Sequence, residues 1–109
     1  MARYLVQASY NNSAIQAFTQ HPQDRTQAVK TIVEHFGGRL EAFYFSMGDH
    51  DVVAIAELPN DVTATAMSLA VQTAGHLRHY ATTKLLTEEE MMEAMTMSHG
   101  LHYPAPSRD

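Results

Sequence analysis

His50 and Asp51 are adjacent residues whose side chains could act in general acid–base chemistry. Histidine titrates near neutral pH, and a carboxylate can hold an imidazole in the tautomer that accepts a proton. Successive strand residues point to opposite faces of a sheet, so direct contact between the two is not expected. Two interpretations stay open. Either residue is a catalytic base, or residues 48–51 form a solvated turn whose aspartates accept hydrogen bonds from backbone amides.

Seven histidines raise the question of a metal site. His76 and His79 are three residues apart, as are His99 and His102, and paired imidazoles with carboxylates can ligate zinc or iron. Along a strand, however, a spacing of three places side chains on opposite faces. The chain has no cysteine, which excludes thiolate ligands. We therefore expect no metal and no other cofactor.

The elements that must position these residues follow from the hydrophobic pattern. Near-alternation of apolar residues predicts a strand over residues 3–10, and a nearly continuous apolar run predicts one over 51–58. Strands are also expected over residues 40–47 and 77–85. Helical spacing and capping signals predict a short helix over 13–19, a helix from Asp24 to the glycine pair at 37–38, and one from Asn60 to Gly75. The apolar face of this last helix is predicted to comprise Val62, Ala66, Leu69, Ala70 and Thr73.

This order predicts an α+β fold, a ferredoxin-like βαββαβ antiparallel sheet with its helices on one face. Thr87 and Glu90 have capping-box spacing and predict a C-terminal helix after the sheet, with an apolar stripe of methionines. We expect one domain over residues 1–98. Residues 99–109 contain two prolines and are expected to form a loose arm or a strap on a neighbouring chain.

The face of the sheet without helices cannot be fully polar, because Leu5, Val53 and Ile55, or their neighbours of opposite parity, must point to it. An exposed apolar sheet face marks an interface, so we expect a homodimer or higher homo-oligomer that closes two sheets into a dimeric α/β barrel. The alternative is that the C-terminal helix folds back over this face.

The interior of such a barrel would suit a small organic ligand. A two-residue turn at Gly48-Asp49 or Asp49-His50 places the alternate hairpin residues Tyr44 and Asp51 on the uncovered face. We expect five polar residues to surround the ligand: Gln7, Tyr44, Asp51, Arg78 and Tyr80.

Composition excludes other partners. The 109 residues carry a net charge of −5, with only 7 lysines and arginines scattered along the chain, so nucleic acid is not expected. No stretch approaches the roughly 20 apolar residues of a membrane span, and the sequence from Met1 leads directly into a strand pattern. We expect a cytoplasmic protein without a membrane partner.

The residues Met47-Gly48-Asp49-His50-Asp51-Val52-Val53-Ala54-Ile55, with Arg3-Tyr4 before them and Leu85 to Met91 after them, resemble the GYD domain family over about residues 2–95. His50 stands where the family's motif has a tyrosine, so no role of that tyrosine is carried over. The resemblance implies ferredoxin-like protomers in a dimeric α/β barrel and names no activity. Three functions remain: a binder of a small organic molecule, a cofactor-independent monooxygenase or isomerase with His50 or Asp51 as base, or a structural or regulatory oligomerisation module.

Overall fold

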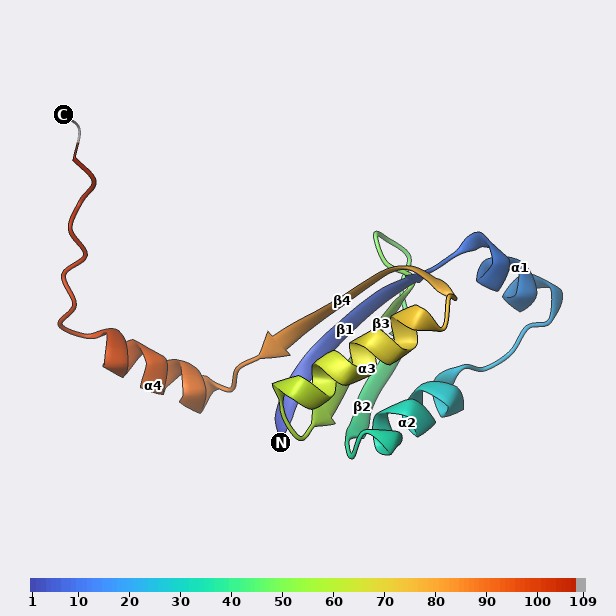
Figure 1. The fold of residues 1–109 in the computed structure, drawn as a ribbon, viewed down its shortest axis with the longest axis horizontal. Coiled ribbons are helices and arrows are strands. Elements are labelled where there is room, and N and C mark those ends of the chain that lie inside the picture. The colour runs from blue at the N-terminus through green and yellow to red at the C-terminus, as the bar shows by residue number, and fades with distance from the viewer. Residues whose placement is uncertain (108–109) are drawn as a thin grey trace.

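The computed structural model describes residues 1–107 (Figure 1). Its elements, in chain order, are β1 (Ala2–Tyr10), α1 (Asn12–Gln20), α2 (Thr26–His35), β2 (Arg39–Phe45), β3 (Val52–Leu58), α3 (Asp61–Thr73), β4 (Leu77–Leu85) and α4 (Glu88–Ser98). The predicted α+β class and C-terminal helix are confirmed. The short helix predicted before Pro22 is α1.

The four strands form one antiparallel sheet in the order β2-β3-β1-β4, which is compatible with a ferredoxin-like fold. The central strand β3 alternates strictly between buried and half-buried residues. Val52, Ala54, Ala56 and Leu58 are buried, whereas Val53, Ile55 and Glu57 are half-buried. This alternation shows that helices cover one face of the sheet and leave the other uncovered.

The hairpin between β2 and β3 has a wider turn than predicted. Phe45 pairs with Val52, and the Ser46 amide donates to the Asp51 carbonyl at 2.8 Å, so residues 47–50 form the loop. Gly48 is not among the described glycines with positive φ, which are Gly37, Gly75 and Gly100. The loop keeps an even number of residues, so the predicted faces of the hairpin hold although the tight turn does not.

Helices α2 and α3 lie on the same face of the sheet (Figure 1). Beneath them is the core, which consists of Tyr4, Val6, Val33, Ala54, Ala56, Leu58, Ala64 and Met67. A glycine is required where α2 gives way to β2, because a Cβ at Gly38 would lie 2.2 Å from the Glu57 carbonyl oxygen. Helix α3 is joined to the sheet through Asp61, whose carboxylate accepts a hydrogen bond from the Tyr4 hydroxyl at 2.5 Å.

The predicted apolar face of α3 is wrong. The helix buries Ala64 and Met67, while Val62 and Leu69 are 78% and 60% exposed. Apolar residues occur around most of this helix, so their spacing does not define one stripe. The position of α3 on the sheet selects the side that is buried.

Helix α4 extends away from the sheet instead of folding back over it (Figure 1). Its predicted capping box is present, since the Thr87 hydroxyl accepts from the Glu90 amide and the Glu90 carboxylate accepts from the Thr87 amide. None of its residues is buried. The arm continues through exposed residues 99–107, and residues 108–109 of the predicted tail lie outside the described part of the chain.

Candidate functional site

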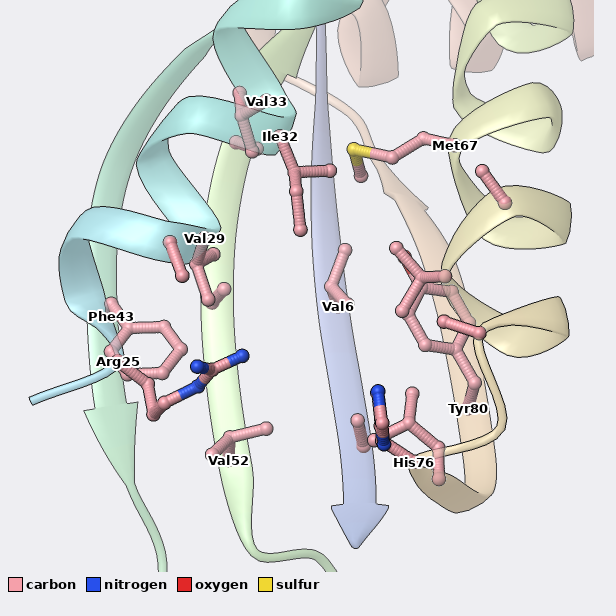
Figure 2. A pocket seen from close by; sticks show the side chains of 18 of the residues that line it. Val6, Arg25, Val29, Ile32, Val33, Phe43, Val52, Met67, His76 and Tyr80 are labelled. Atoms are coloured by element: carbon pink, nitrogen blue, oxygen red, sulfur yellow. The ribbon is translucent and has the colours of Figure 1, made fainter. Parts of the chain in front are cut away.

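An apolar groove lies between α2 and α3, on the helix side of the sheet (Figure 2). Its volume is about 500 Å³. Central strands β1 and β3 provide the floor, with Val6 and Val52 among the residues that line it. Val29 and Ile32 of α2 form one wall, and Met67 of α3 points in from the other (Figure 2).

Small side chains leave this space open. Six alanines line the groove: Ala8, Ala28, Ala54, Ala56, Ala70 and Ala74. Helix α2 packs mainly on β2 and α3 mainly on β4, the two edge strands, so the helices stand apart over the middle of the sheet. Interiors of proteins are normally packed to high density. Here the floor residues Ala54 and Ala56 are buried, but wall residues such as Val29 and Ile32 remain partly exposed.

Polar groups gather at one end of the groove. Arg25, which immediately precedes α2, directs its guanidinium into it, and His76 and Tyr80 lie opposite (Figure 2). Arg25 packs over the Phe18 ring of α1 at 5.6 Å and lies close enough to Tyr10 for its charge to lower the pKa of that phenol. The Tyr10 ring in turn meets Phe18 edge-on at 4.8 Å. Helix α1 thus helps to hold the arginine in place.

The two tyrosines at this end stay neutral at ordinary pH. Burial raises the pKa of Tyr10 above its usual value, and the positive charge of Arg25 partly opposes that shift. Burial likewise raises the pKa of Tyr80. Their hydroxyls are therefore hydrogen-bonding groups and carry no negative charge.

The structure does not bring together the five predicted ligand-binding residues. Tyr80 lines the groove, but Gln7 and Tyr44 lie on the uncovered face, where Gln7 pairs with Val53 and Ala81, and Tyr44 pairs with Val53. Tyr80 pairs with buried Ala8, so its predicted place beside Gln7 and Tyr44 is wrong. The alternation in β4 is weak, and its register on β1 determines which residues face the helices.

Arg78 is exposed and lies at an irregularity in the sheet. Ser9 pairs with His79 and Tyr10 pairs with Leu77, so the register shifts at this residue. Such a bulge leaves no sequence signal that distinguishes it from regular alternation. Arg25, at the start of a helix, was missed because only the folded chain places it beside Tyr10.

Asp51 has a structural contact outside the groove. Its carboxylate accepts a hydrogen bond from the Tyr10 amide at 2.9 Å, and its own amide donates to the Ala8 carbonyl at 2.9 Å. The Asp51 side chain thus takes the place of a strand carbonyl as the hydrogen-bond acceptor for the last amide of β1. This is the kind of amide hydrogen bond that the turn interpretation predicted. A role of Asp51 as a base or in ligand binding stays a prediction.

His50 also lies apart from the groove. Its ring stacks on His79, with centroids 5.2 Å apart and planes inclined by 23°. Its Nδ1 atom is buried and has no hydrogen-bond partner within residues 1–107. Over the same part of the chain, no three His, Asp or Glu residues are grouped to hold a metal ion. A catalytic role of His50 stays a prediction.

The uncovered face of the sheet is apolar in its middle and charged at one end. Leu5, Val53 and Ile55 are half-buried there, and Tyr44 is 68% exposed. At the charged end Arg3 contacts the carboxylates of Glu41 and Glu57 at 2.9 and 3.2 Å, and Arg39 contacts Glu57 at 3.2 Å. This charge cluster is balanced, with two basic and two acidic side chains.

The fold and groove define a small α+β protein with a four-stranded antiparallel sheet and helices on one of its faces. The chain matches the GYD domain model over residues 4–95 and belongs to the GYD domain family, which confirms the resemblance noted in the sequence. A crystal structure of a hypothetical protein, PHS023 from Pyrococcus horikoshii, is similar in fold, with a TM-score of 0.52 and 10% sequence identity. The match covers 94% of this chain and 100% of that one.

No curated protein matches the sequence significantly. None of the helices within residues 1–107 is both long enough and apolar enough to cross a membrane.

Proposed function

We propose that this GYD-family protein binds a small, largely apolar organic molecule in the groove between α2 and α3. The observation that carries this proposal is an open space of about 500 Å³ with apolar walls over the centre of the sheet. Ligand sites in proteins commonly have volumes of about 300–1,000 Å³, apolar linings and a few polar groups that orient the ligand. The site differs from the expected barrel interior, since it lies on the opposite face of the sheet.

The chemistry of the lining favours an apolar ligand. Val29, Ile32, Val71 and Phe43 present hydrocarbon or ring surface to the groove. Transfer of apolar surface from water to such walls is favourable by roughly 25 cal/mol per Å². The guanidinium of Arg25 lies at one end of the groove, so a ligand with one acceptor end would be bound in a single orientation.

A pair of tryptophan substitutions on α3 tests this proposal. Ala70 lines the groove, whereas Ala66, one turn earlier on the same helix, is exposed and does not line it. The neutral fluorophore N-phenyl-1-naphthylamine should bind the wild-type protein saturably, with one molecule per chain. Ala70→Trp should weaken binding at least about tenfold by filling the groove, and Ala66→Trp should leave it unchanged.

Two results would overturn the proposal. One is a wild-type protein that shows no saturable binding of the fluorophore. The other is equal binding by the two tryptophan variants, which would place the fluorophore elsewhere on the surface. Circular dichroism and urea unfolding of both variants establish that neither substitution has disrupted the fold.

The uncovered sheet face supports a second part of the proposal, a homodimer. Leu5, Val53 and Ile55 form an apolar patch that nothing within the described chain covers, because α4, with its four exposed methionines, extends away from the sheet. Two copies that pair through this face would bury the patch, with Gln7 and Tyr44 at the interface. Native mass spectrometry of the purified protein tests this: a dimer supports the pairing, and a monomer at micromolar concentration overturns it.

A further inference from the structure

We infer that the ligand of the α2–α3 groove is an amphipathic carboxylate, whose carboxyl group pairs with Arg25 and whose hydrocarbon part fills the apolar floor. This inference rests on the proposed binding function and specifies the class of ligand. It follows from two features of the groove: its charge and the donors that Arg25 directs into it.

The groove is basic in an acidic protein. The chain has 12 Asp and Glu residues against 7 Lys and Arg, yet no Asp or Glu within residues 1–107 lines the groove. Arg25, His35 and His76 do line it. A cationic end on an apolar cavity concentrates anions, because charges interact more strongly next to low-dielectric walls than in bulk water.

Arg25 differs from the other arginines with described contacts. Arg3 and Arg39 form ion pairs with Glu41 and Glu57 on the other face of the sheet. No carboxylate within residues 1–107 forms an ion pair with Arg25. The guanidinium is instead restrained by neutral partners, namely the Phe18 ring and the Gln23 amide oxygen, which accepts a long hydrogen bond of 3.4 Å.

A guanidinium has five N–H donors in a planar fork that matches a carboxylate. The neutral partners of Arg25 leave donors that point into the groove (Figure 2). A single such arginine suits a singly charged carboxylate better than a doubly charged phosphate, whose transfer into an apolar groove costs more. His76 and Tyr80 across the same end can complete the hydrogen bonding of the carboxyl group (Figure 2).

Octanoate and 1-octanol, which share a chain length and differ in charge, form the test pair. Each is titrated against protein loaded with N-phenyl-1-naphthylamine at neutral pH, and its affinity is taken from displacement of the fluorophore. Arg25→Gln should lower the ratio of octanoate affinity to octanol affinity about tenfold, because a charge-assisted hydrogen bond is lost. Lys30→Gln removes the same charge from exposed α2 outside the lining and should leave the ratio within about twofold.

The outcomes separate the inference from the proposed function. If neither compound displaces the fluorophore from wild-type protein, the groove itself is not a ligand site. If both displace it and Arg25→Gln leaves the ratio unchanged, the groove stands and the carboxylate inference is overturned. A salt titration of wild-type protein needs no variant. Raising NaCl from about 0.05 to about 0.5 M should weaken the binding of octanoate and leave the binding of octanol unchanged. Equal changes in the two affinities would also overturn the inference.

Discussion

At the centre of β3, the two faces of the sheet differ in the size of their apolar side chains, in the opposite sense to what a self-sufficient monomer would require. On the helix side β3 presents Ala54 and Ala56, which are buried but small. On the uncovered side the same strand presents Val53 and Ile55, which are larger and remain half-buried. Small residues under the helices leave room for a ligand, whereas large residues on the open face require a covering partner.

The faces also differ in their charges. The uncovered face pairs its charges internally, and the carboxylate of Glu41, by hydrogen bond and charge, raises the pKa of Arg3. The groove has an arginine without a described acidic partner. A balanced cluster suits contact with an identical copy, and an unbalanced one suits an anion.

The largest difference between the faces is expected in stability. Leu58 is fully buried on the helix side, so Leu58→Ala should lower the free energy of unfolding by about 2–5 kcal/mol through loss of packing and a new cavity. Val53→Ala on the uncovered face should lower it by less than about 1 kcal/mol in the monomer. Urea unfolding at low protein concentration measures both. Similar losses for the two variants would mean that the uncovered face contributes equally to the fold.

The second difference concerns assembly. Ile55→Lys places a charge in the middle of the uncovered face and should weaken the proposed dimer at least about 100-fold, equivalent to about 2.7 kcal/mol. Val62→Lys, on the exposed side of α3, serves as the matched control and should not affect it. Sedimentation velocity over a concentration series gives the dissociation constants. A dimer that tolerates Ile55→Lys would have to use another surface.

The third difference is a pH effect confined to the helix side. Burial, with the hydrogen bond to Asp61 and its negative charge, raises the pKa of Tyr4 to about 12. Because this value is above the ordinary 10.0, neutral Tyr4 stabilises the folded state fully below about pH 10. This contribution to the free energy of unfolding is lost as the pH rises towards 12. Tyr4→Phe should therefore cost about 1 kcal/mol at pH 8 and less near pH 12.

Absorbance of tyrosinate during alkaline titration gives a direct readout of the same group. The wild-type protein should show a late ionisation step near pH 12 that Tyr4→Phe removes. Loss of a different step, or of none, would contradict the assignment.

The smallest effect is expected in α4, which belongs to neither face. Thr87→Ala removes the capping box and should lower the helix–coil equilibrium constant of α4 about fivefold, equivalent to about 1 kcal/mol. The free energy of unfolding of the sheet domain should not change measurably. Chemical shifts of residues 88–98 report the helix population. Thr96→Ala within the same helix leaves the box intact and should not reduce helicity.

Acid should act on the same helix. The pKa of Glu90 is lowered by its hydrogen bonds with Thr87. Ionised Glu90 therefore stabilises the helix above the ordinary pKa of 4.5, and this stabilisation is lost as the pH falls through the lowered pKa. A helix population that does not respond to Thr87→Ala or to acid would mean that α4 is held by a neighbouring chain.

Local pattern was sufficient for most of the fold. The two faces of β3 and the capping box at Thr87 each depend on residues close in sequence, and each was predicted correctly. The cap of α3 was narrowed to Asn60 or Asp61, and the structure has Asn60. The errors occurred where pattern is ambiguous. Helix α3 is apolar around much of its circumference, and β4 lacks clear alternation, so the buried side of each is selected by its neighbours.

The sequence by itself determined the elements, their order, the capping box of α4 and the existence of an apolar face that the helices cannot cover, because these follow from spacing and capping over a few residues. The start of α2 was not among them, since the helix has Arg25 at its N-cap position, with no side-chain capping hydrogen bond, where Asp24 was expected. Only the tertiary structure decided that α2 and α3 stand apart, that Tyr80 faces the helices and that Arg25 lies beside Tyr10 and opposite His76. Those facts depend on strand register and helix placement, which arise from contacts between residues far apart along the chain.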